Sequence, residues 1–314
     1  MKKFGLTGAA GYVAPRHLKA IKDTGNDLTA CFDPHDSVGV LDHFFPQANY
    51  FTGYERFERH LTKLALNADT KIDFLTVCSP NHLHDSQIRL GLNVGADVIC
   101  EKPLVLFPQN LDLLEELENK TGKKVYTVMQ LRNHPSLVAL KEEIKNSSNK
   151  KYKVELTYIT SRGNWYHYSW KGDEEKSGGI ATNIGIHLFD LLIWLFGGVV
   201  NSEVHLSNKN KMSGLLELQN ADVTWYLSID ENDLPVEIRL QNKSTFRSII
   251  VDEKEIEFTE GFTNLHTRVY EEILRGNGLG ISEARPSIEA VYNIRFAKVE
   301  ENENFIHPLL SKVR

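Results

Sequence analysis

An acid, an amine and a proline stand together where an apolar run ends. Residues 97–103 read DVICEKP, so Glu101, Lys102 and Pro103 follow the apolar residues with no turn residue between them. Pro103 excludes the α region for Lys102, so the backbone fixes the direction of the amine. An amine that is partly desolvated can lose its proton and act as a proton relay. A structural ion pair and a solvated strand end are the alternatives.

A second group that titrates near neutral pH is His187, in the apolar segment GIHLFD. An imidazole there can accept the proton of an alcohol, although a histidine on an apolar helix is also often a satisfied core residue. His82 and His84 lack a third ligand with suitable spacing, so we expect no bound metal.

Five β-rich runs before residue 130 alternate with segments of helical length. They are residues 3–8, 28–33, 74–80, 97–103 and 124–130. This alternation indicates a βαβ series, and nearly continuous apolar runs suit a parallel sheet that is covered on both faces. Ligands bind at the carboxyl ends of such strands. Glu101 and Lys102 are therefore expected beside a ligand crevice.

Beyond residue 130 the strand candidates follow one another mostly without helices. They are residues 151–160, 201–208, 214–230, 235–242 and 247–260. This pattern predicts an open, mostly antiparallel sheet. The chain is thus expected to be an α/β protein with one domain at 1–130 and a second at 131–314.

Two helices are predicted in the second domain. The apolar segment 186–197 is closed by Gly197 and Gly198. A later helix is expected to begin at Pro286. One face of that helix would carry Ile288, Val291, Tyr292 and Phe296.

A glycine turn follows the first predicted strand. The sequence GAAGYVA places Gly8 and Gly11 in the turn and Ala14 at the start of a helix, one residue off the usual spacing of a dinucleotide-binding fingerprint. Asp33 ends the second strand, where an acid binds ribose hydroxyls and repels a 2′-phosphate, which favours NAD over NADP. A glycine turn with an unrelated capping aspartate is the alternative. The expected cofactor contacts here are Gly8, Ala10, Gly11, Tyr12, Val13 and Asp33.

Further cofactor contacts are expected after the third and fourth predicted strands. Ser79 and Asn81 could contact the ribose or nicotinamide, and His84 could approach it, although Asn81 is equally suited to be a helix N-cap. Glu101 and Lys102 would lie beside the nicotinamide, where a second positive charge disfavours the protonated amine. Arg132 completes the set.

The composition favours a small-molecule ligand. The formal charge of -6 is spread without long like-charged blocks, which argues against a nucleic-acid or acidic-membrane partner. Cys31, Cys78 and Cys100 each lie in an apolar stretch, as small core residues of a reducing compartment do. The start MKKFGLTG does not resemble a secretory signal, and no run of 18 apolar residues occurs. We therefore expect a cytoplasmic protein.

The glycine turn, Glu101-Lys102-Pro103 and the segment GGIATNIGIHLFDLLIWLFG together resemble the glucose-fructose oxidoreductase and inositol dehydrogenase family. The resemblance spans essentially the whole chain. It implies an N-terminal Rossmann domain, with a doubly wound parallel sheet, and a C-terminal α/β domain whose open sheet mediates assembly, as a homotetramer or homodimer. Members oxidise or reduce a carbinol of a sugar or cyclitol with a nicotinamide cofactor.

The same resemblance assigns the catalytic residues. Lys102 matches the family's strand-end lysine, and the G-x-H-x-x-D pattern supplies Gly185, His187 and Asp190. Many members have an aspartate two residues before that glycine, where this chain has Asn183. Because an amide cannot take a proton, His187 is the expected general base and Lys102 would orient or polarise the hydroxyl.

Four stretches narrow the resemblance to one branch of the family. They are GAAGYVAPRH, SRGNWYHYSWKG, ATNIGIHLFD and the segment 261–289. That branch oxidises C3 of UDP-N-acetylglucosaminuronic acid for bacterial surface polysaccharides. It implies NAD, with 2-oxoglutarate as an acceptor that reoxidises NADH in some members.

Such a substrate carries a carboxylate and a diphosphate, so cations and backbone donors are expected around it. Trp165 and Tyr166 could stack on uracil or sugar, although an interface or core cluster is the alternative reading of NWYHYSW. The expected substrate contacts are Arg16, Arg162, Asn164, Trp165, Tyr166, Lys171, Asn183, His187 and Arg285.

Two rival functions stay open on the sequence. The first is a dehydrogenase of a free inositol or hexose. The second is a nicotinamide-binding sensor without turnover, against which the presence of both Lys102 and His187 argues.

Overall fold

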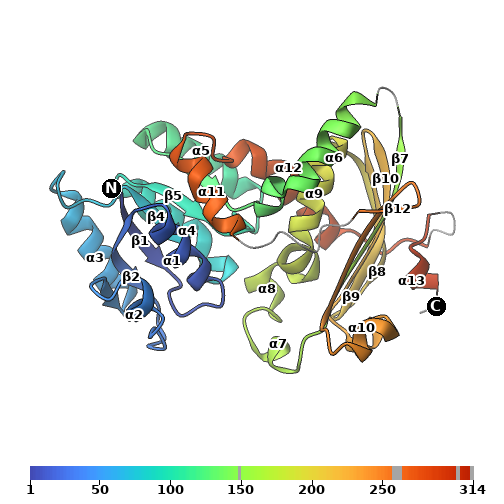
Figure 1. Cartoon of the computed structure of the whole chain (residues 1–314), viewed down its shortest axis with the longest axis horizontal. Helices are drawn as coiled ribbons and strands as arrows, with labels where there is room; N and C mark the ends of the chain where they lie inside the picture. The colour runs from blue at the N-terminus through green and yellow to red at the C-terminus, as the bar shows by residue number, and fades with distance from the viewer. Residues whose placement is uncertain (148–149, 257–263, 302–304, 312–314) are drawn as a thin grey trace. The chain divides into compact units, whose positions relative to one another are not determined.

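The computed structural model describes residues 1–147, 150–256, 264–301 and 305–311. The chain forms two compact units, which are unit 1 (Met1–Asn133 with Thr263–Arg285) and unit 2 (His134–Phe262 with Pro286–Arg314). In the described residues each unit is built on a six-stranded sheet (Figure 1). The return of residues 263–285 to the first unit is a feature that the sequence pattern did not indicate.

The sheet of unit 1 has the strand order β3-β2-β1-β4-β5-β6, and all neighbouring strands are parallel. Its strands are β1 (Lys3–Thr7), β2 (Asp27–Phe32), β3 (Asn49–Phe51), β4 (Phe74–Val77), β5 (Asp97–Cys100) and β6 (Val125–Thr127). The order is that of the doubly wound Rossmann fold, which confirms the predicted class. The five predicted strands are present, and the three-residue β3 was not foreseen.

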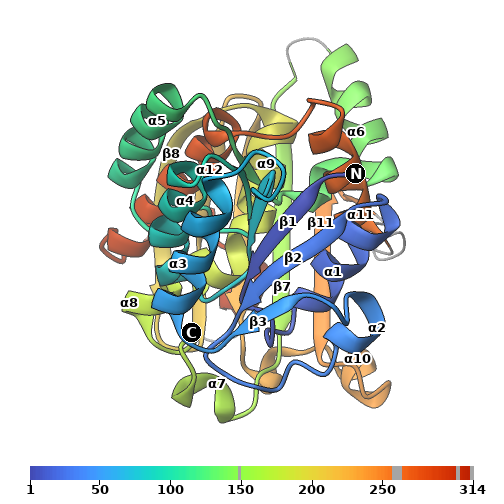
Figure 2. The same cartoon turned by 90° about the vertical axis from the view of Figure 1, so that its left-hand side faces the viewer.

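Helices cover both faces of this sheet. Figure 2 shows α1 and α11 on one side, and α3, α4 and α5 on the other. The helical segments of unit 1 are α1 (Ala14–Asp23), α2 (Leu41–Phe44), α3 (Tyr54–Ala65), η1 (Asn81–Leu83), α4 (His84–Asn93), α5 (Gln109–Thr121), η2 (Gln130–Asn133) and α11 (Leu265–Leu274). Because the central strands β1, β4 and β5 are covered on both sides, their side chains are nearly all buried.

Tyr270 explains why α11 belongs to unit 1. Its ring stacks on Phe4 of β1 at a centroid distance of 5.9 Å, and Phe4 stacks on Phe74 of β4 at 5.0 Å. Tyr270 is also fully buried, so α11 completes the core on that face of the sheet. The three cysteines are free and buried, which confirms them as core residues.

The sheet of unit 2 has the strand order β12-β11-β7-β10-β9-β8. Its strands are β7 (Tyr152–Thr160), β8 (Val199–Ser207), β9 (Lys211–Leu218), β10 (Ala221–Ser228), β11 (Thr245–Val251) and β12 (Lys254–Glu255). Only β10 and β7 pair in parallel among the described strands of this sheet, so the predicted, mostly antiparallel sheet is confirmed.

Two predicted strands, 214–230 and 247–260, are each divided by a turn into two antiparallel strands, β9 with β10 and β11 with β12. A third predicted strand is wrong. Residues 235–242 contain the short helix α10 (Val236–Leu240) instead. Val236 is 55% exposed and Leu240 is 79% exposed, so the segment has no buried face of period two to pair with the sheet. The end of the predicted strand 247–260, from residue 257, lies outside the described residues.

The helical segments of unit 2 include the predicted apolar helix. They are α6 (Pro135–Asn146), α7 (Trp165–Tyr168), α8 (Glu174–Ser177), η3 (Ala181–Gly185), α9 (Ile186–Phe196), η4 (Glu231–Asp233), α10, most of α12 (Ile281–Phe296) and α13 (Pro308–Ser311). As predicted, α9 ends at Gly197, which has a positive φ of 96°. Its Phe189 meets Trp225 of β10 edge to face at 5.3 Å, so α9 packs on the sheet.

The helical stretch Glu174–Phe196 is long and apolar enough to cross a membrane, by length and composition alone. However, 78% of its most apolar part is buried inside the protein. This burial is typical of a core helix that packs on a sheet, as the contact between Phe189 and Trp225 shows.

The last long helix begins earlier than expected. α12 starts at Ile281, and Pro286 lies inside it. The backbone N–H of Gly280 and the hydroxyl of Ser282 both donate to the Glu283 carboxylate, at 2.8 and 2.9 Å, which stabilises a start before the proline. The predicted face is correct at Ile288 and Val291 but wrong at Phe296, which is 59% exposed.

Gly8 gives a test of the first turn of the fold. Its φ is +86°, and a Cβ atom there would lie 2.6 Å from backbone atoms of Cys78 and Ser79. We expect Gly8→Ala to lower the free energy of unfolding by about 2–4 kcal/mol, since strain and a backbone clash add. Gly25→Ala is the control, because Gly25 has a φ of +72° with no atom near its Cβ position, and it should cost only about 1 kcal/mol. Scanning calorimetry measures both, and equal losses would contradict the clash.

His307 predicts a pH dependence for unit 2. Burial lowers the pKa of His307 to about 4, and its Nδ1 accepts the N–H of Leu309, which only the neutral ring can do. The unfolded chain therefore binds this proton more readily, and stability is lost as the pH falls from about 6.5 towards 4, by up to about 3 kcal/mol.

The His307→Gln variant should lack this part of the pH dependence, because glutamine does not titrate. All four tryptophans of the chain belong to unit 2, so tryptophan fluorescence in urea at pH 7 and pH 4.5 follows the relevant unit. If the wild type and the variant lose the same free energy of unfolding between the two pH values, this account is wrong.

Candidate functional site

The turn after β1 has the geometry of a phosphate-binding loop. Gly8 donates its N–H to Phe32 O at 2.8 Å, and Gly11 donates to Gly8 O at 2.9 Å, so the chain reverses tightly. As predicted, α1 begins at Ala14, and Pro15 lies in its first turn. The N-cap residue, Val13, makes no side-chain hydrogen bond to the first N–H groups of the helix. The N–H groups of such a helix start can bind an anionic phosphate.

Asp33 follows β2 directly and is held at this turn. Its Oδ2 accepts the N–H of Ala10 at 3.0 Å, and its Oδ1 accepts the N–H of His35 at 2.9 Å. A carboxylate has further acceptor capacity on both oxygens, so it can still bind two ribose hydroxyls. The glycine turn, the uncapped helix start and this fixed acid together fit NAD.

The segment after β4 is held from within. Ser79 Oγ donates to Gln87 Oε1 at 2.7 Å, and Asn81 is the first residue of η1 rather than the cap before it. His84 is fully buried, and its ring nitrogens lie 2.7 Å from Pro103 O and 2.9 Å from Ser79 O. His84 thus contacts two backbone carbonyls, a role that the sequence pattern did not suggest. Its contact with a cofactor stays a prediction.

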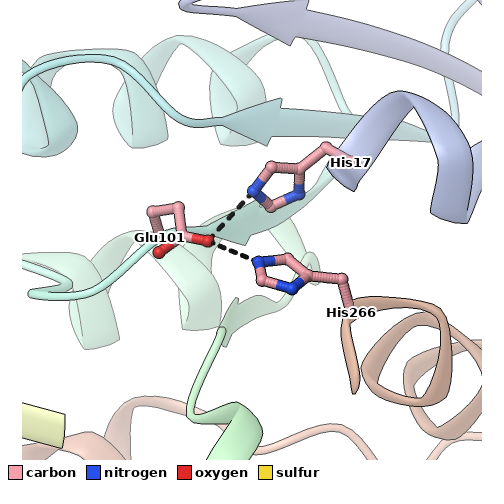
Figure 3. Close-up of side chains that lie close together, drawn as sticks. All are labelled: His17, Glu101 and His266. Carbon is pink, nitrogen blue, oxygen red and sulfur yellow. Dashed lines mark hydrogen bonds and ion pairs between the residues drawn. The ribbon is translucent and has the colours of Figure 1, made fainter. Parts of the chain in front are cut away.

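At the end of β5, Glu101 is buried and Lys102 is half-buried, and the peptide bond from Lys102 to Pro103 is cis. Oε1 of Glu101 lies 3.1 Å from Nε2 of His17 on α1 and 3.0 Å from Nε2 of His266 on α11 (Figure 3). Burial raises the pKa of Glu101, but the hydrogen bonds from both histidines outweigh this effect, and the pKa lies well below its usual value.

Sequence reasoning missed His17 and His266 as partners of this acid. Each is a single histidine in a helical segment, 84 residues before and 165 residues after Glu101. No local spacing connects such distant residues, so only the packing of α1 and α11 on the sheet reveals the contact.

Four other predicted contacts lie in unit 1. Tyr12 is 83% exposed, and the guanidinium of Arg16 lies over its ring at 5.6 Å. Arg132 donates to the carbonyl of Glu283 at 3.1 Å. Arg285 forms ion pairs with two acids of α5, Asp112 at 2.8 Å and Glu115 at 3.0 Å.

In unit 2, His187 is the second residue of α9 and is half-buried. The helix α9 directly follows η3, a π-helical turn of the kind that is frequent at functional sites. Within that turn, Nδ2 of Asn183 donates to the hydroxyl of Tyr166 at 2.9 Å. Tyr166 is itself only 3% exposed, so its ring belongs to the core. This position agrees with a core cluster, which was the alternative to stacking on a ligand.

Two cations and an exposed aromatic ring gather around α7. Trp165 is 53% exposed, and the Lys171 amine lies 5.3 Å from its ring centre and 5.6 Å from that of Trp170. Burial and then the charge of Arg162 lower the pKa of Lys171. Asn164 precedes α7 and is exposed. An anionic group bound here would relieve the repulsion between the two cations, and a flat ring could stack on Trp165.

The predicted residues therefore separate by unit. The cofactor residues and Lys102 belong to unit 1, around the carboxyl ends of β1, β2, β4 and β5, with Arg132 in η2. Most predicted substrate residues belong to unit 2, around α7, η3 and α9, but Arg16 and Arg285 belong to unit 1.

Two family models match this chain. Residues 2–129 match "Oxidoreductase family, NAD-binding Rossmann fold", and residues 149–247 match "Oxidoreductase family, C-terminal alpha/beta domain".

Solved structures with the same fold include dehydrogenases crystallised with nucleotides. The WlbA (WbpB) dehydrogenase from Thermus thermophilus in complex with NAD and alpha-ketoglutarate is 51% identical, with a TM-score of 0.95 over 98% of this chain and 99% of that chain. The same Thermus enzyme with NAD and UDP-GlcNAcA aligns at 50% identity with the same TM-score and coverage. The WlbA dehydrogenase from Bordetella pertussis is 20% identical with a TM-score of 0.75 over 93% of each chain, which shows the shared fold.

Curated relatives are more distant and match in part. Inositol 2-dehydrogenase of Rhizobium meliloti is 27% identical over 62% of this chain and 55% of its own length. Glucose-6-phosphate 3-dehydrogenase of Bacillus subtilis is 25% identical over 62% of this chain and 54% of its own length. The matched region thus spans about half the length of these relatives.

Asp33 gives a test of the nucleotide site. We expect Asp33→Ser to weaken NAD binding about ten-fold or more and to improve NADP relative to NAD, because two carboxylate hydrogen bonds and a repulsive charge are lost. Asp36→Ser is the matched control, since Asp36 is an exposed acid three residues further on. Calorimetric titration with both nucleotides measures the effect. Equal NAD affinities in the two variants would rule out Asp33 as the ribose ligand.

Proposed function

Because the chain belongs to the glucose-fructose oxidoreductase and inositol dehydrogenase family (GFO_IDH_MocA), we propose that it is an NAD-dependent dehydrogenase of the C3 hydroxyl of UDP-N-acetyl-D-glucosaminuronic acid. The observation that carries this proposal is the alignment, at 50% identity over 98% of this chain, with a dehydrogenase crystallised with NAD and UDP-GlcNAcA. The 3-keto sugar would then serve the synthesis of a di-acetamido uronic acid for surface polysaccharide such as O-antigen.

The cations of unit 2 support a substrate of this chemistry. UDP-N-acetylglucosaminuronic acid offers a diphosphate and a carboxylate for Arg162 and Lys171, whose mutual repulsion an anion relieves. Its uracil or sugar ring offers a flat face to the exposed Trp165. A free inositol carries neither charge, so it would not relieve the repulsion between the two cations.

Oxidation of a secondary alcohol removes a proton from oxygen and a hydride from carbon. NAD supplies the hydride acceptor when it is bound. We assign the proton to the imidazole of His187, because histidine is the side chain whose unperturbed pKa lies closest to neutral pH. The Lys102 amine would donate a hydrogen bond to the same hydroxyl, orienting it and stabilising the oxygen as it loses its proton.

Asn183 supports the choice of His187 as base. Its position is where many family members have an acid, but its amide has no proton-accepting role and is committed to the Tyr166 hydroxyl at 2.9 Å. Asn183 would therefore help to orient the substrate at η3, and the half-buried His187, two residues beyond the end of this turn, would take the proton.

Two further expectations from the resemblance and one from the composition are also proposals. 2-oxoglutarate is the proposed acceptor that reoxidises NADH, in keeping with the alpha-ketoglutarate in the Thermus complex. The open sheet of unit 2 is the proposed assembly surface of a homotetramer or homodimer, which light scattering would detect. The proposed compartment is the cytoplasm, where UDP-sugars are made.

A substrate comparison tests the proposed function. We expect formation of NADH, or of 2-hydroxyglutarate when 2-oxoglutarate is added, with UDP-N-acetylglucosaminuronic acid and none with myo-inositol. More than one equivalent of product per protein without added NAD would indicate that the cofactor stays bound through the cycle. Turnover of inositol alone would overturn the substrate, and binding of NAD without any turnover would favour a sensor.

His187→Asn tests the base. We expect turnover to fall by a factor of about 10²–10⁴, the usual contribution of general base catalysis, with NAD affinity unchanged. His205→Asn is the matched control, because His205 is a buried histidine of the same unit on β8. Unchanged turnover of the His187 variant would show that the base lies elsewhere.

A further inference from the structure

Unit 1 contains a buried cluster to which the proposed reaction assigns no role. His17 from α1 and His266 from α11 both place Nε2 against the same oxygen of Glu101, at 3.1 and 3.0 Å (Figure 3). The two rings meet edge to face with centroids 5.1 Å apart. The side chain of His17 is fully buried, and those of His266 and Glu101 are each 9% exposed.

The hydrogen bonds of the cluster fix where its protons lie. Oε1 of Glu101 can only accept while the carboxyl is ionised, so each histidine donates from Nε2. Nδ1 of His17 is then an acceptor, and the Tyr270 hydroxyl lies 2.9 Å from it. Thr76 Oγ1 lies 2.9 Å from the same hydroxyl and can donate to it. One directed chain therefore runs from Thr76 through Tyr270 and His17 to Glu101.

The protonation states agree with this chain. Burial lowers the pKa of His17, so its ring is neutral and carries a single N–H. Burial raises the pKa of Tyr270 well above its usual value, so the phenol keeps the proton that it donates. The other titratable groups that face Glu101 are Cys78, Cys100 and His84, and burial favours the neutral form of each. Glu101 is thus a buried anion that the Nε2–H groups of two imidazoles stabilise.

The position of Glu101 in the chain connects this cluster to Lys102. Oε2 of Glu101 accepts the backbone N–H of Lys102 at 3.3 Å. On the other side of Lys102, the carbonyl of Pro103 lies 2.7 Å from Nδ1 of the buried His84. Contacts with buried histidines therefore fix the backbone on both sides of Lys102. The side chain that carries the amine branches from the backbone between these two fixed points.

The cluster also has the ligand types of a metal site, with its three ligand atoms within 4.8 Å of one another. Distances of 3.0 and 3.1 Å are, however, those of ordinary hydrogen bonds, and the chain through Tyr270 and Thr76 satisfies the ring of His17 without an ion. Hydrogen bonds therefore account for the contacts of this cluster, and metal binding is one outcome of the test below.

We infer that His17 and His266 are positioning residues for Lys102, which act through the ionised carboxylate of Glu101 to fix the strand end that carries the amine. This inference rests on the proposed function for its kinetic readout only. Burial raises the pKa of Glu101, and the hydrogen bonds from the two histidines oppose this rise. If one of these donors is lost, the carboxyl becomes protonated at a higher pH. Its hydrogen bond from the N–H of Lys102 then weakens.

The test compares His266→Leu with His266→Gln, whose amide can still donate to Glu101. We expect His266→Leu to lower kcat by on the order of 10- to 100-fold with little change in KM or NAD affinity, as misplacement of a catalytic group does. Its kcat should fall at a higher pH than that of the wild type as the medium is acidified. His266→Gln should restore most of kcat and the pH profile, and Tyr270→Phe, which removes the donor to His17, should shift the profile in the same direction as His266→Leu but less.

A second readout needs no turnover. In the protein as purified, hydrogen exchange of the peptide that contains Lys102 should be faster in His266→Leu and close to the wild type in His266→Gln. The control is His205→Leu, which removes a histidine–glutamate contact of 3.2 Å in unit 2 and should leave this peptide unchanged.

The outcomes separate the two proposals. If the wild type does not oxidise the nucleotide sugar but the exchange data follow this pattern, the proposed function fails and the positioning role stands. If His266→Leu keeps the wild-type pH profile and exchange, the positioning role is refuted. Zinc that co-purifies in stoichiometric amount, and whose removal changes exchange in the wild type but not in His266→Leu, would replace it with a metal site.

Discussion

A buried carboxylate that must be satisfied is the constraint on which unit 1 depends most. Glu101 lies at the end of a central strand, and its charge is stable there because His17 and His266 both donate to one of its oxygens. These partners come from α1 and α11, so the contact joins the first helix of the chain to one that follows residue 264. It also explains why residues 263–285 belong to the first unit: without α11, Glu101 would lose a donor and the core would lose Tyr270.

The end of β5 carries a fixed acid next to the lysine of the proposed reaction. Glu101 faces inward and is fixed by hydrogen bonds, while Lys102 is the next residue and half-buried. Reactions that move a proton require a group whose position does not vary, because small displacements cost large factors in rate. A strand end anchored on both sides supplies such a position more reliably than a surface loop. This division between a buried, anchoring acid and a half-buried lysine gives the pair of charges after the apolar run a physical reason.

The two units contribute different chemistry. Unit 1 offers the glycine turn and the fixed carboxylate of Asp33, which suit a nucleotide cofactor. Unit 2 offers Lys171 and Arg162 beside Trp165, which suit an anionic ligand with a flat ring. Each group follows from local geometry within its own unit. The likeness to the Thermus dehydrogenase then gives both groups a common purpose, the oxidation of an acidic nucleotide sugar.

The sequence by itself determined the class of the fold and the residues that carry chemistry, because these depend on short-range patterns. Apolar runs that alternate with helices predicted a parallel sheet covered on both faces, and the residues after its strands included Gly8, Asp33 and Lys102. Local patterns failed where exposure or capping decided the outcome, as at the exposed α10 and at the start of α12, which Glu283 stabilises before Pro286. Only the tertiary structure brought His17, His266 and Tyr270 to Glu101, because contacts over 84 and 165 residues arise from the packing of helices on a sheet and leave no spacing in the chain.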